Sequence, residues 1–320
     1  MGVIVEETTL SFPFGVMISS VTTIYPVIEP SIPKERLRGT MDQPLQALAT
    51  DEQLVAATEA NYRAYFAGFT ILPRIQMWQE PTFTAFIANS PPGNSVLTTH
   101  FGEATVAAEI RDLLARLAPI VRFAWWQILP SCQPADLAEH LRAAGLKSLP
   151  DESRPVMTLA LTTRPAAPPP PQGLVIRRVS DATTMQDWTA ASMQGFETNA
   201  KNVQPYHDAY TALGFAEDAA SQHFVGYLAG VPVTSATVLF AAGLAGIYDV
   251  STAPSARRQG CGIAITEACL VAAEGRGYHH AVLQASPEGL GVYQRLGFHE
   301  RYREQNFGWL HPDEIKSQTD

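Results

Sequence analysis

The sequence predicts a mixed α/β fold in two halves, and three observations lead to this prediction. Short β-rich apolar segments alternate with longer segments whose apolar residues recur at helical spacing. Hydrophobic residues make up 46% of the 320 residues and charged residues 17%, which is sufficient for a well-packed core. A proline-rich segment, residues 163–173, divides the chain, and consecutive prolines favour a stiff extended linker without helix or strand partners.

We therefore expect four parts along the chain. Residues 1–50 form an extension whose role the sequence does not indicate, and residues 51–162 form a first α/β domain. The linker at 163–173 leads to a second α/β domain at 174–320.

The second half has the clearer alternation of strands and helices. Asp181 is a suitable N-cap for its first helix, and Ala229-Gly230 is a hairpin signal between two β-rich runs. Gly275 and Gly277 are expected to end its longest helix. The expected strands are 174–179, 223–228, 231–240, 246–252, 280–285 and 302–309, and the expected helices are 182–196, 206–213, 262–276 and 289–296.

The first half repeats the end of this order. Its expected strands are 83–88, 95–100, 120–129 and 156–161, and its expected helices are 103–117 and 135–144. In both halves a helix ends in Gly plus a large apolar residue, in LAEHLRAAGL (137–146) and in GVYQRLGF (291–298). The shared β-α-β-α-β order suggests an internal duplication.

Composition and charge limit the classes of partner. The net charge of −9 argues against a nucleic-acid-binding surface, which needs clustered Lys and Arg. The three cysteines, Cys132, Cys261 and Cys269, are too few and too odd in number for a disulfide framework. Glu6 and Glu7 stand where a signal peptide carries basic residues, and no run of about 18 apolar residues offers a membrane span. A cytoplasmic protein without nucleic-acid or membrane partners is expected, as a monomer or homodimer.

The most informative stretch is VSTAPSARRQGCGI (250–263), which lies between an apolar strand and an alanine-rich helix. The first turn of a helix leaves backbone N–H groups without partners, and the helix macrodipole adds positive charge there. Gly260 and Gly262 remove side-chain bulk, so that an anion can approach the main chain. Arg257 and Arg258 can add charge-assisted contacts, so phosphate or pyrophosphate is the expected guest.

Two common phosphate-binding motifs do not match this loop. A Walker loop requires G-x-x-x-x-G-K-[ST], which the chain lacks. A dinucleotide-binding loop requires a third glycine where Ile265 stands, early in a parallel βαβ unit. A tight strand-to-helix turn with two solvated arginines is the remaining structural alternative.

The residues on both sides of the loop resemble the GNAT superfamily of acyl-CoA-dependent N-acyltransferases. R-x-x-G-x-G (257–262) is similar to the family's signature of Gln or Arg, two residues, Gly, one residue, and Gly or Ala. Ile247–Pro254 looks like the family's fourth strand, and LQASPEGLGVYQRLGF (283–298) looks like its fifth strand and following helix. The resemblance covers about residues 174–310. It implies two GNAT-like acyl-CoA N-acyltransferase domains in tandem, the N-terminal copy being degenerate.

The resemblance also implies a cofactor site for acetyl-CoA or another acyl-CoA as co-substrate, without a metal. By position, the backbone amides of Arg258–Ile263 hold the CoA pyrophosphate, and the main chain of Val250 and Thr252 pairs with the pantetheine arm. The fourth and fifth strands splay apart in the family, which brings Ser286 near the thioester. The expected cofactor-binding set is Val250, Ser251, Thr252, Arg257, Arg258, Gln259, Gly260, Cys261, Gly262, Ile263 and Ser286.

Two residues are candidates for the chemistry of acyl transfer. Tyr293 stands where the family often has a general acid, and its phenol can protonate the leaving thiolate. The base is less clear, because the family's usual glutamate falls on Gly246. Asp249 is the sole carboxylate on that strand, although strict alternation can point it to the wrong face. A water chain, Glu288 or His207 is an alternative base.

The first half departs from the family pattern. THFGEATVAAEI (99–110) leads into its first helix without an R-x-x-G-x-G loop, and Leu141 stands where the second half has Tyr293. We therefore expect this half to be a scaffold, or one wall of the acceptor pocket, rather than a second CoA site. The expected function is transfer of an acyl group, taken as acetyl, to a primary amine of an unidentified small-molecule acceptor. A non-catalytic CoA- or metabolite-binding sensor is the alternative.

Overall fold

The computed structural model describes residues 6–11, 17–23, 43–88, 90 and 93–316. The strands are β1 (Glu6–Ser11), β2 (Met17–Thr23), β3 (Gln76–Glu80), β4 (Phe83–Ile87), β5 (Ser95–Thr99), β6 (Phe123–Ile128), β7 (Lys147–Ala160), β8 (Leu174–Arg178), β9 (Ser221–Leu228), β10 (Val231–Ala241), β11 (Leu244–Thr252), β12 (His280–Gln284) and β13 (His299–Leu310). The helices are α1 (Asp51–Gly68), α2 (Val106–Leu117), α3 (Leu137–Ala143), α4 (Ala182–Gly195), α5 (Val203–Ala212), α6 (Cys261–Gly275), α7 (Pro287–Arg295) and α8 (Pro312–Lys316).

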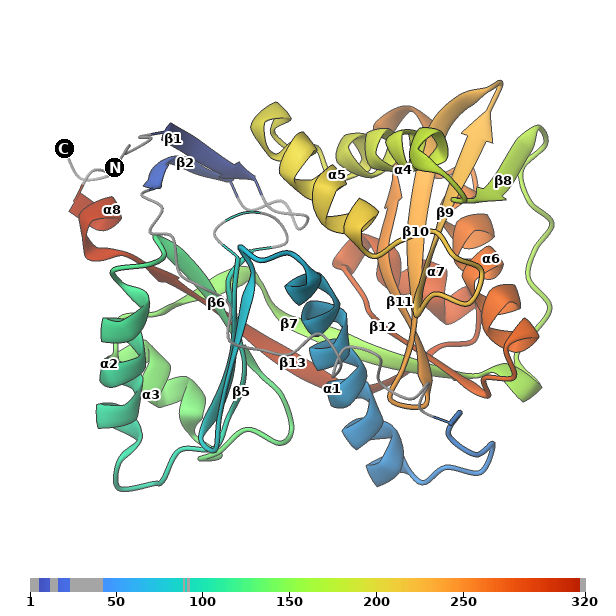
Figure 1. Cartoon of the computed structure of the whole chain (residues 1–320). Coiled ribbons are helices and arrows are strands. Elements are labelled where there is room, and N and C mark those ends of the chain that lie inside the picture. The colour runs from blue at the N-terminus through green and yellow to red at the C-terminus, as the bar shows by residue number, and fades with distance from the viewer. Residues whose placement is uncertain (1–5, 12–16, 24–42, 89, 91–92, 317–320) are drawn as a thin grey trace.

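One large sheet runs through both halves of the chain (Figure 1). Its 11 strands have the order β3-β4-β5-β6-β13-β7-β12-β11-β10-β9-β8, and β1 and β2 form a separate antiparallel pair. Parallel and antiparallel pairs both occur, so the predicted mixed α/β fold is confirmed. The expected N-cap is also present, because the Asp181 side chain accepts a hydrogen bond from the Thr184 amide at 2.8 Å.

The two halves exchange their last strands. β13 ends the second half but lies between β6 and β7, with Phe307 opposite Trp126 of β6. β7 ends the first half but pairs with β12, with Met157 opposite Leu283. The division of the chain at 163–173 remains a prediction about domain organisation, while the hydrogen-bonded sheet is continuous across it.

Helices cover both faces of the sheet. Alternate residues of β4 show the two sides, because Ala85 belongs to the core beneath α2 and α3 while Phe86 belongs to the core that includes α1, α4 and α5. α6 and α7 pack on strands of the second half, and a third hydrophobic core lies between them and these strands. Of the helices and strands that the structure describes, β1, β2, β3, α1 and α8 were not predicted from the sequence.

The proline-rich linker is tied to α6. The Arg164 guanidinium donates to the Glu267 carboxylate at 2.7 and 2.8 Å and to Glu274 at 2.7 Å. The expectation of a linker without helix partners is therefore wrong at Arg164.

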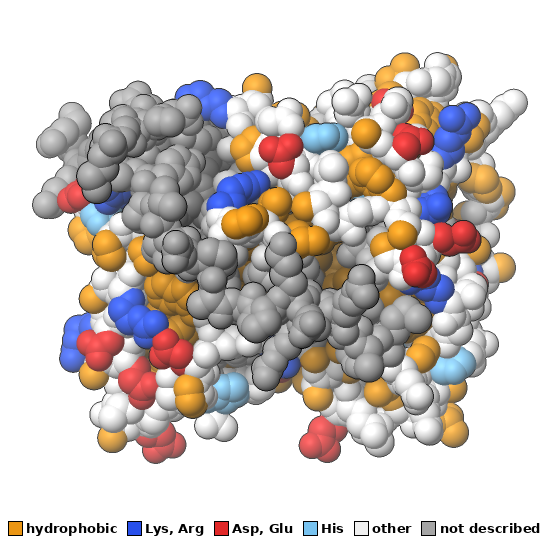
Figure 2. All heavy atoms as spheres, in the orientation of Figure 1, with side chains coloured by type: hydrophobic (Ala, Val, Ile, Leu, Met, Phe, Trp, Pro, Cys, Tyr) orange, Lys and Arg blue, Asp and Glu red, His pale blue; other side chains and the backbone are white. Residues whose placement is uncertain are grey.

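The surface in Figure 2 carries Lys and Arg side chains interspersed with Asp and Glu. This face therefore has no continuous basic patch among its described residues, of the kind that coats nucleic acid. No helix in the described part of the chain combines the length and apolar character that crossing a membrane requires.

The strand exchange can be tested with two pairs of cysteines. Gln305 of β13 lies opposite both Ile128 of β6 and Ser153 of β7, so Ile128 and Ser153 are two strands apart. Two strand spacings are about 9.6 Å, which is beyond disulfide reach. Under mild oxidation, I128C/Q305C should form an intramolecular disulfide and I128C/S153C should not, as measured by mass spectrometry. The reverse outcome would place β7 directly beside β6 and contradict the exchange.

Candidate active site

An opening separates β11 from β12 in the second half. These parallel strands pair only through Ala245 with Ala281 and through Gly246 with Val282. Beyond these residues β11 remains paired with β10, and β12 with β7. The facing edges of β11 and β12 therefore have no partner strand within the described residues, as a splayed pair requires.

The glycine loop connects β11 to α6. Gly260 is the N-cap of α6 with a φ of 90°, a left-handed conformation that favours glycine, and no side chain caps the helix. Apart from any contact with undescribed segments, the main-chain N–H groups of Arg258–Ile263 donate no hydrogen bond to protein acceptors. A side chain at Gly262 would meet only the Thr252 hydroxyl, at 3.7 Å. The loop thus presents free amides at the positive end of a helix.

The two arginines of the loop differ in their partners. Arg257 donates to the carbonyl oxygens of Thr252 at 3.1 Å and Gly195 at 2.8 Å, and to the Glu197 carboxylate at 2.9 Å. These bonds tie the loop to β11 and to the end of α4, so Arg257 holds the loop in place. Arg258 is exposed and makes no ion pair with a described residue.

The other residues predicted to bind cofactor lie on different sides of β11 and α6. Val250 and Ile263 are half-buried against the core beneath α6. Ser251 points to the other face, where its hydroxyl hydrogen-bonds that of Ser235 at 2.9 Å. Cys261 is buried in the first turn of α6, and burial raises the pKa of its thiol. The structure therefore turns the Ser251 side chain away from the free amides of the loop.

A β-bulge decides the direction of Asp249. Residues Ser235 and Thr237 of β10 pair with Ser251 and Tyr248 of β11, so two residues of β11 lie opposite one residue of β10. Asp249 takes a φ of 54° within this bulge. Strict alternation from Ile247 would turn Asp249 toward the α6 face, but the extra residue returns it to the face of α1 and α5.

Three tyrosines surround the Asp249 carboxylate. The Tyr65 hydroxyl donates to its oxygens at 3.1 and 3.4 Å, and the Tyr206 hydroxyl donates at 3.1 Å. The Tyr210 hydroxyl lies 2.6 Å from that of Tyr65. Burial raises the pKa of Asp249 to about 6, although hydrogen bonds from the tyrosines and Thr237 oppose this rise. The site therefore contains a carboxylate that exchanges a proton near neutral pH.

Gly246 stands where the family's usual glutamate falls, and the space beside it is occupied. A Cβ atom there would lie 2.0 Å from the Asn61 side-chain oxygen of α1. The Asn61 amide donates to the carbonyls of Ala241 at 2.7 Å and Leu244 at 3.2 Å, and its oxygen accepts from the Tyr248 hydroxyl at 2.7 Å. Glycine is required at this position because α1 docks there.

Tyr293 lies on α7, and Ser286 stands between the end of β12 and the start of this helix. Tyr293 is buried beside Phe298, and burial followed by the nearby Cys269 raises the pKa of its phenol above its usual value. The phenol therefore stays protonated at neutral pH. Ser286 is the N-cap of α7 and accepts from the Gly289 amide at 3.1 Å.

The places of three further predicted site residues, Glu288, His207 and Gln259, are explained without a ligand. Glu288 is exposed in the first turn of α7, where a negative charge favours the helix. The His207 ring is held by the Thr189 hydroxyl at 3.0 Å, and the Gln259 amide donates to the Ser255 carbonyl at 2.9 Å. The described residues contain no group of three or more His, Cys, Asp or Glu arranged to hold a metal.

The first half has a similar opening that its own chain fills. β5 and β6 pair only through Ser95 with Trp125 and Val96 with Trp126. Beyond them, the Gln133 amide donates to the end of β5, at the Thr99 carbonyl, at 2.8 Å. The segment after β6 therefore takes the position that stays open between β11 and β12.

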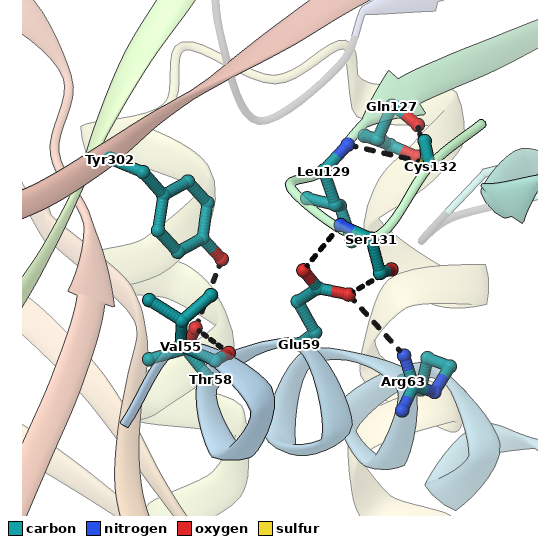
Figure 3. A network of polar contacts seen from close by, with 9 residues as sticks. All are labelled: Val55, Thr58, Glu59, Arg63, Gln127, Leu129, Ser131, Cys132 and Tyr302. Carbon is teal, nitrogen blue, oxygen red and sulfur yellow. Dashed lines mark hydrogen bonds and ion pairs between the residues drawn. The ribbon is translucent and has the colours of Figure 1, made fainter. Parts of the chain in front are cut away.

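α1 fixes this segment through Glu59. The Glu59 carboxylate accepts from the Ser131 amide at 3.0 Å and from the Ser131 hydroxyl, and Arg63 lies 3.9 Å from it (Figure 3). Thr58 reaches the Tyr302 hydroxyl of β13 at 3.0 Å on the neighbouring side of the helix. One helix thus closes the opening of the first half and contacts Asp249 in the second.

Four polar side chains of this site, Asn61, Tyr65, Tyr206 and Tyr210, were not predicted from the sequence. A signal existed in α1, because NYRAYFAGF (61–69) places aromatic residues at i, i+3, i+4 and i+7.

Comparisons with known proteins show which family and fold the chain resembles. Residues 189–311 match the family model of the GNAT acetyltransferase domain. A GCN5-related N-acetyltransferase from Kribbella flavida is 20% identical, with 78% of this chain and 95% of that chain covered and a TM-score of 0.59. A tandem GNAT protein from the clavulanic acid biosynthesis pathway is 14% identical, with 84% and 98% covered and a TM-score of 0.54.

A third similar structure is a GCN5-related N-acetyltransferase from Sphaerobacter thermophilus, 14% identical, with 84% and 94% covered and a TM-score of 0.52. No curated protein matches the chain. The second half of the chain thus contains a segment that matches the GNAT acetyltransferase domain, and the chain as a whole has the fold of tandem GNAT proteins.

The raised pKa of Asp249 predicts that stability falls as pH rises. The unfolded chain releases this proton near 3.8 and the folded chain near 6, so the cost develops between these values and is constant above them. D249N keeps a hydrogen-bond acceptor, and its free energy of unfolding should exceed that of the wild type by about 3 kcal/mol at pH 8. This difference should disappear near pH 4. Urea unfolding at pH 4, 6 and 8 measures this, and D208N on the exposed side of α5 is the control. A pH-independent gap would contradict the expected cost.

Proposed function

We propose that the protein is an acyltransferase that moves an acetyl group from acetyl-CoA to a primary amine by direct transfer. One observation supports this above the others. The free amides at the start of α6 adjoin the opening between β11 and β12, so an anchored nucleotide can extend its arm along β11. The family match at 189–311 includes this loop.

Cofactor binding is assigned to the main chain of the loop. The N–H groups of Arg258–Ile263 hold the diphosphate, and Arg258 adds a positive charge from solvent. Main-chain groups of Val250 and Thr252 align the pantetheine along the open edge of β11, beside Ser286. Arg257 keeps the loop in place through Glu197.

The chemistry needs one proton removed from the amine and one returned to sulfur. Asp249 takes one proton from the nitrogen of the neutral amine as it attacks the thioester carbonyl, because its pKa of about 6 leaves it ionised at neutral pH. Tyr293 gives its phenolic proton to the departing thiolate, since burial keeps the phenol protonated. The carbonyl carbon forms its bond to nitrogen as its bond to sulfur breaks.

Binding of acetyl-CoA tests the cofactor assignment. Isothermal titration should show binding for the wild type and a loss of at least about 100-fold for G262E, because the new carboxylate competes with the diphosphate. Gly262 is preferred to Gly260, whose φ of 90° strains any other residue. G275E, at the far end of α6 with nothing within 4 Å, adds the same charge and should bind normally. Absent wild-type binding, or equal loss in both variants, rejects the site.

Turnover separates a transferase from a sensor. Thiol release from acetyl-CoA with a panel of small primary amines should fall about 100-fold or more in D249N. Y293F should also lose activity while retaining acetyl-CoA affinity. Normal binding without thiol release for any amine would favour the non-catalytic CoA-binding alternative.

A further inference from the structure

We propose that Tyr65 of the first half is a positioning residue for the base, holding the Asp249 carboxylate in place on the α1 and α5 face of β11. This inference rests on the proposed function. It assigns the first half an active part in the site of the second, beyond that of a scaffold or a wall.

The contacts of Tyr65 join the two halves at one atom. Its hydroxyl donates to Asp249 at 3.1 and 3.4 Å and lies 2.6 Å from the Tyr210 hydroxyl. Because one phenol has a single proton, Tyr210 completes the hydrogen bond by donating to the Tyr65 oxygen while Tyr65 donates to the carboxylate. The chain of hydroxyls therefore ends on the Asp249 carboxylate, whose Oδ1 also accepts from Tyr206 at 3.1 Å.

Rigid packing fixes the Tyr65 ring. The ring stacks on Tyr248 at 4.2 Å between centroids and meets the edges of Phe66 at 5.4 Å and Phe69 at 5.3 Å. Asn61, one turn earlier in α1, bonds the main chain of β10 and β11 beside Gly246. Docking of α1 at Gly246 thus sets the height of Tyr65 over Asp249.

Tyr65 differs from the other two tyrosines in exposure. Tyr206 is 1% exposed and Tyr210 0%, whereas Tyr65 and Asp249 are both half-buried. Tyr65 is therefore the least enclosed of the three tyrosines around the carboxylate.

The titratable groups that face Asp249 come from several elements. From α1 this is Tyr65, from α5 Tyr206 and Tyr210, and from β11 Tyr248. Burial and the charge of Asp249 keep Tyr65, Tyr206 and Tyr210 protonated, so each is a donor. From β9, His223 contacts Thr237 at 2.9 Å, and burial lowers the pKa of its ring to about 3, so it is neutral. The charge of Glu304 on β13 contributes to the raised pKa of Tyr248.

Y65F removes the hydroxyl and keeps the packed ring. The pKa of Asp249 should rise by about one pH unit, because a charge-assisted hydrogen bond to the ionised form is lost. We expect the acidic limb of the pH profile of kcat/KM to move up by the same amount. The KM for acetyl-CoA should stay unchanged while kcat falls. Y62F is the matched control on the same helix, since Tyr62 stacks on Tyr248 at 6.4 Å without bonding Asp249.

A second readout is independent of turnover. Infrared difference titration of the Asp249 carboxyl, identified by its loss in D249N, gives its pKa directly in wild type, Y65F and Y62F. A rise in Y65F alone supports the positioning role even if no amine is acetylated. An unchanged Asp249 pKa in Y65F, with normal folding and acetyl transfer, rejects the role and leaves the proposed function standing.

Discussion

The early end of the pairing between β11 and β12 is the constraint on which the rest of the site depends. Only two residue pairs join these parallel strands, so a polar main-chain edge is left inside the molecule. Such an edge is costly unless another group hydrogen-bonds it. The glycine loop and α6 begin beside this edge, which explains why free amides and an open strand occur together.

The two halves differ in what lies beside the open strand edge. In the first half, the segment ending at Gln133 pairs with the end of β5, and Glu59 of α1 holds that segment through Ser131. In the second half, α1 fills the space at Gly246 but leaves the edge of β11 free. The same helix therefore closes one opening and furnishes a tyrosine to the other. The exchange of β7 and β13 fixes the halves around it.

Most of the fold could be predicted from the sequence, because alternation, caps and glycine stops identify the elements of the second half closely. α1 escaped prediction since it buries Thr58, Glu59 and Asn61 together with apolar residues, which blurs its amphipathic pattern. The strand exchange escaped because β7 and β13 both follow a short helix ending in glycine, and nothing local selects their partners. The direction of Asp249 depended on a bulge, which inserts one residue without a recognisable signal.

A crystal structure with bound CoA tests the central claim most directly. We expect the diphosphate at the amides of Arg258–Ile263 and the pantetheine between β11 and β12, with the sulfur between Asp249 and Tyr293. CoA bound at another place, for example between β5 and β6, or a nucleotide that leaves those amides unused, would contradict it.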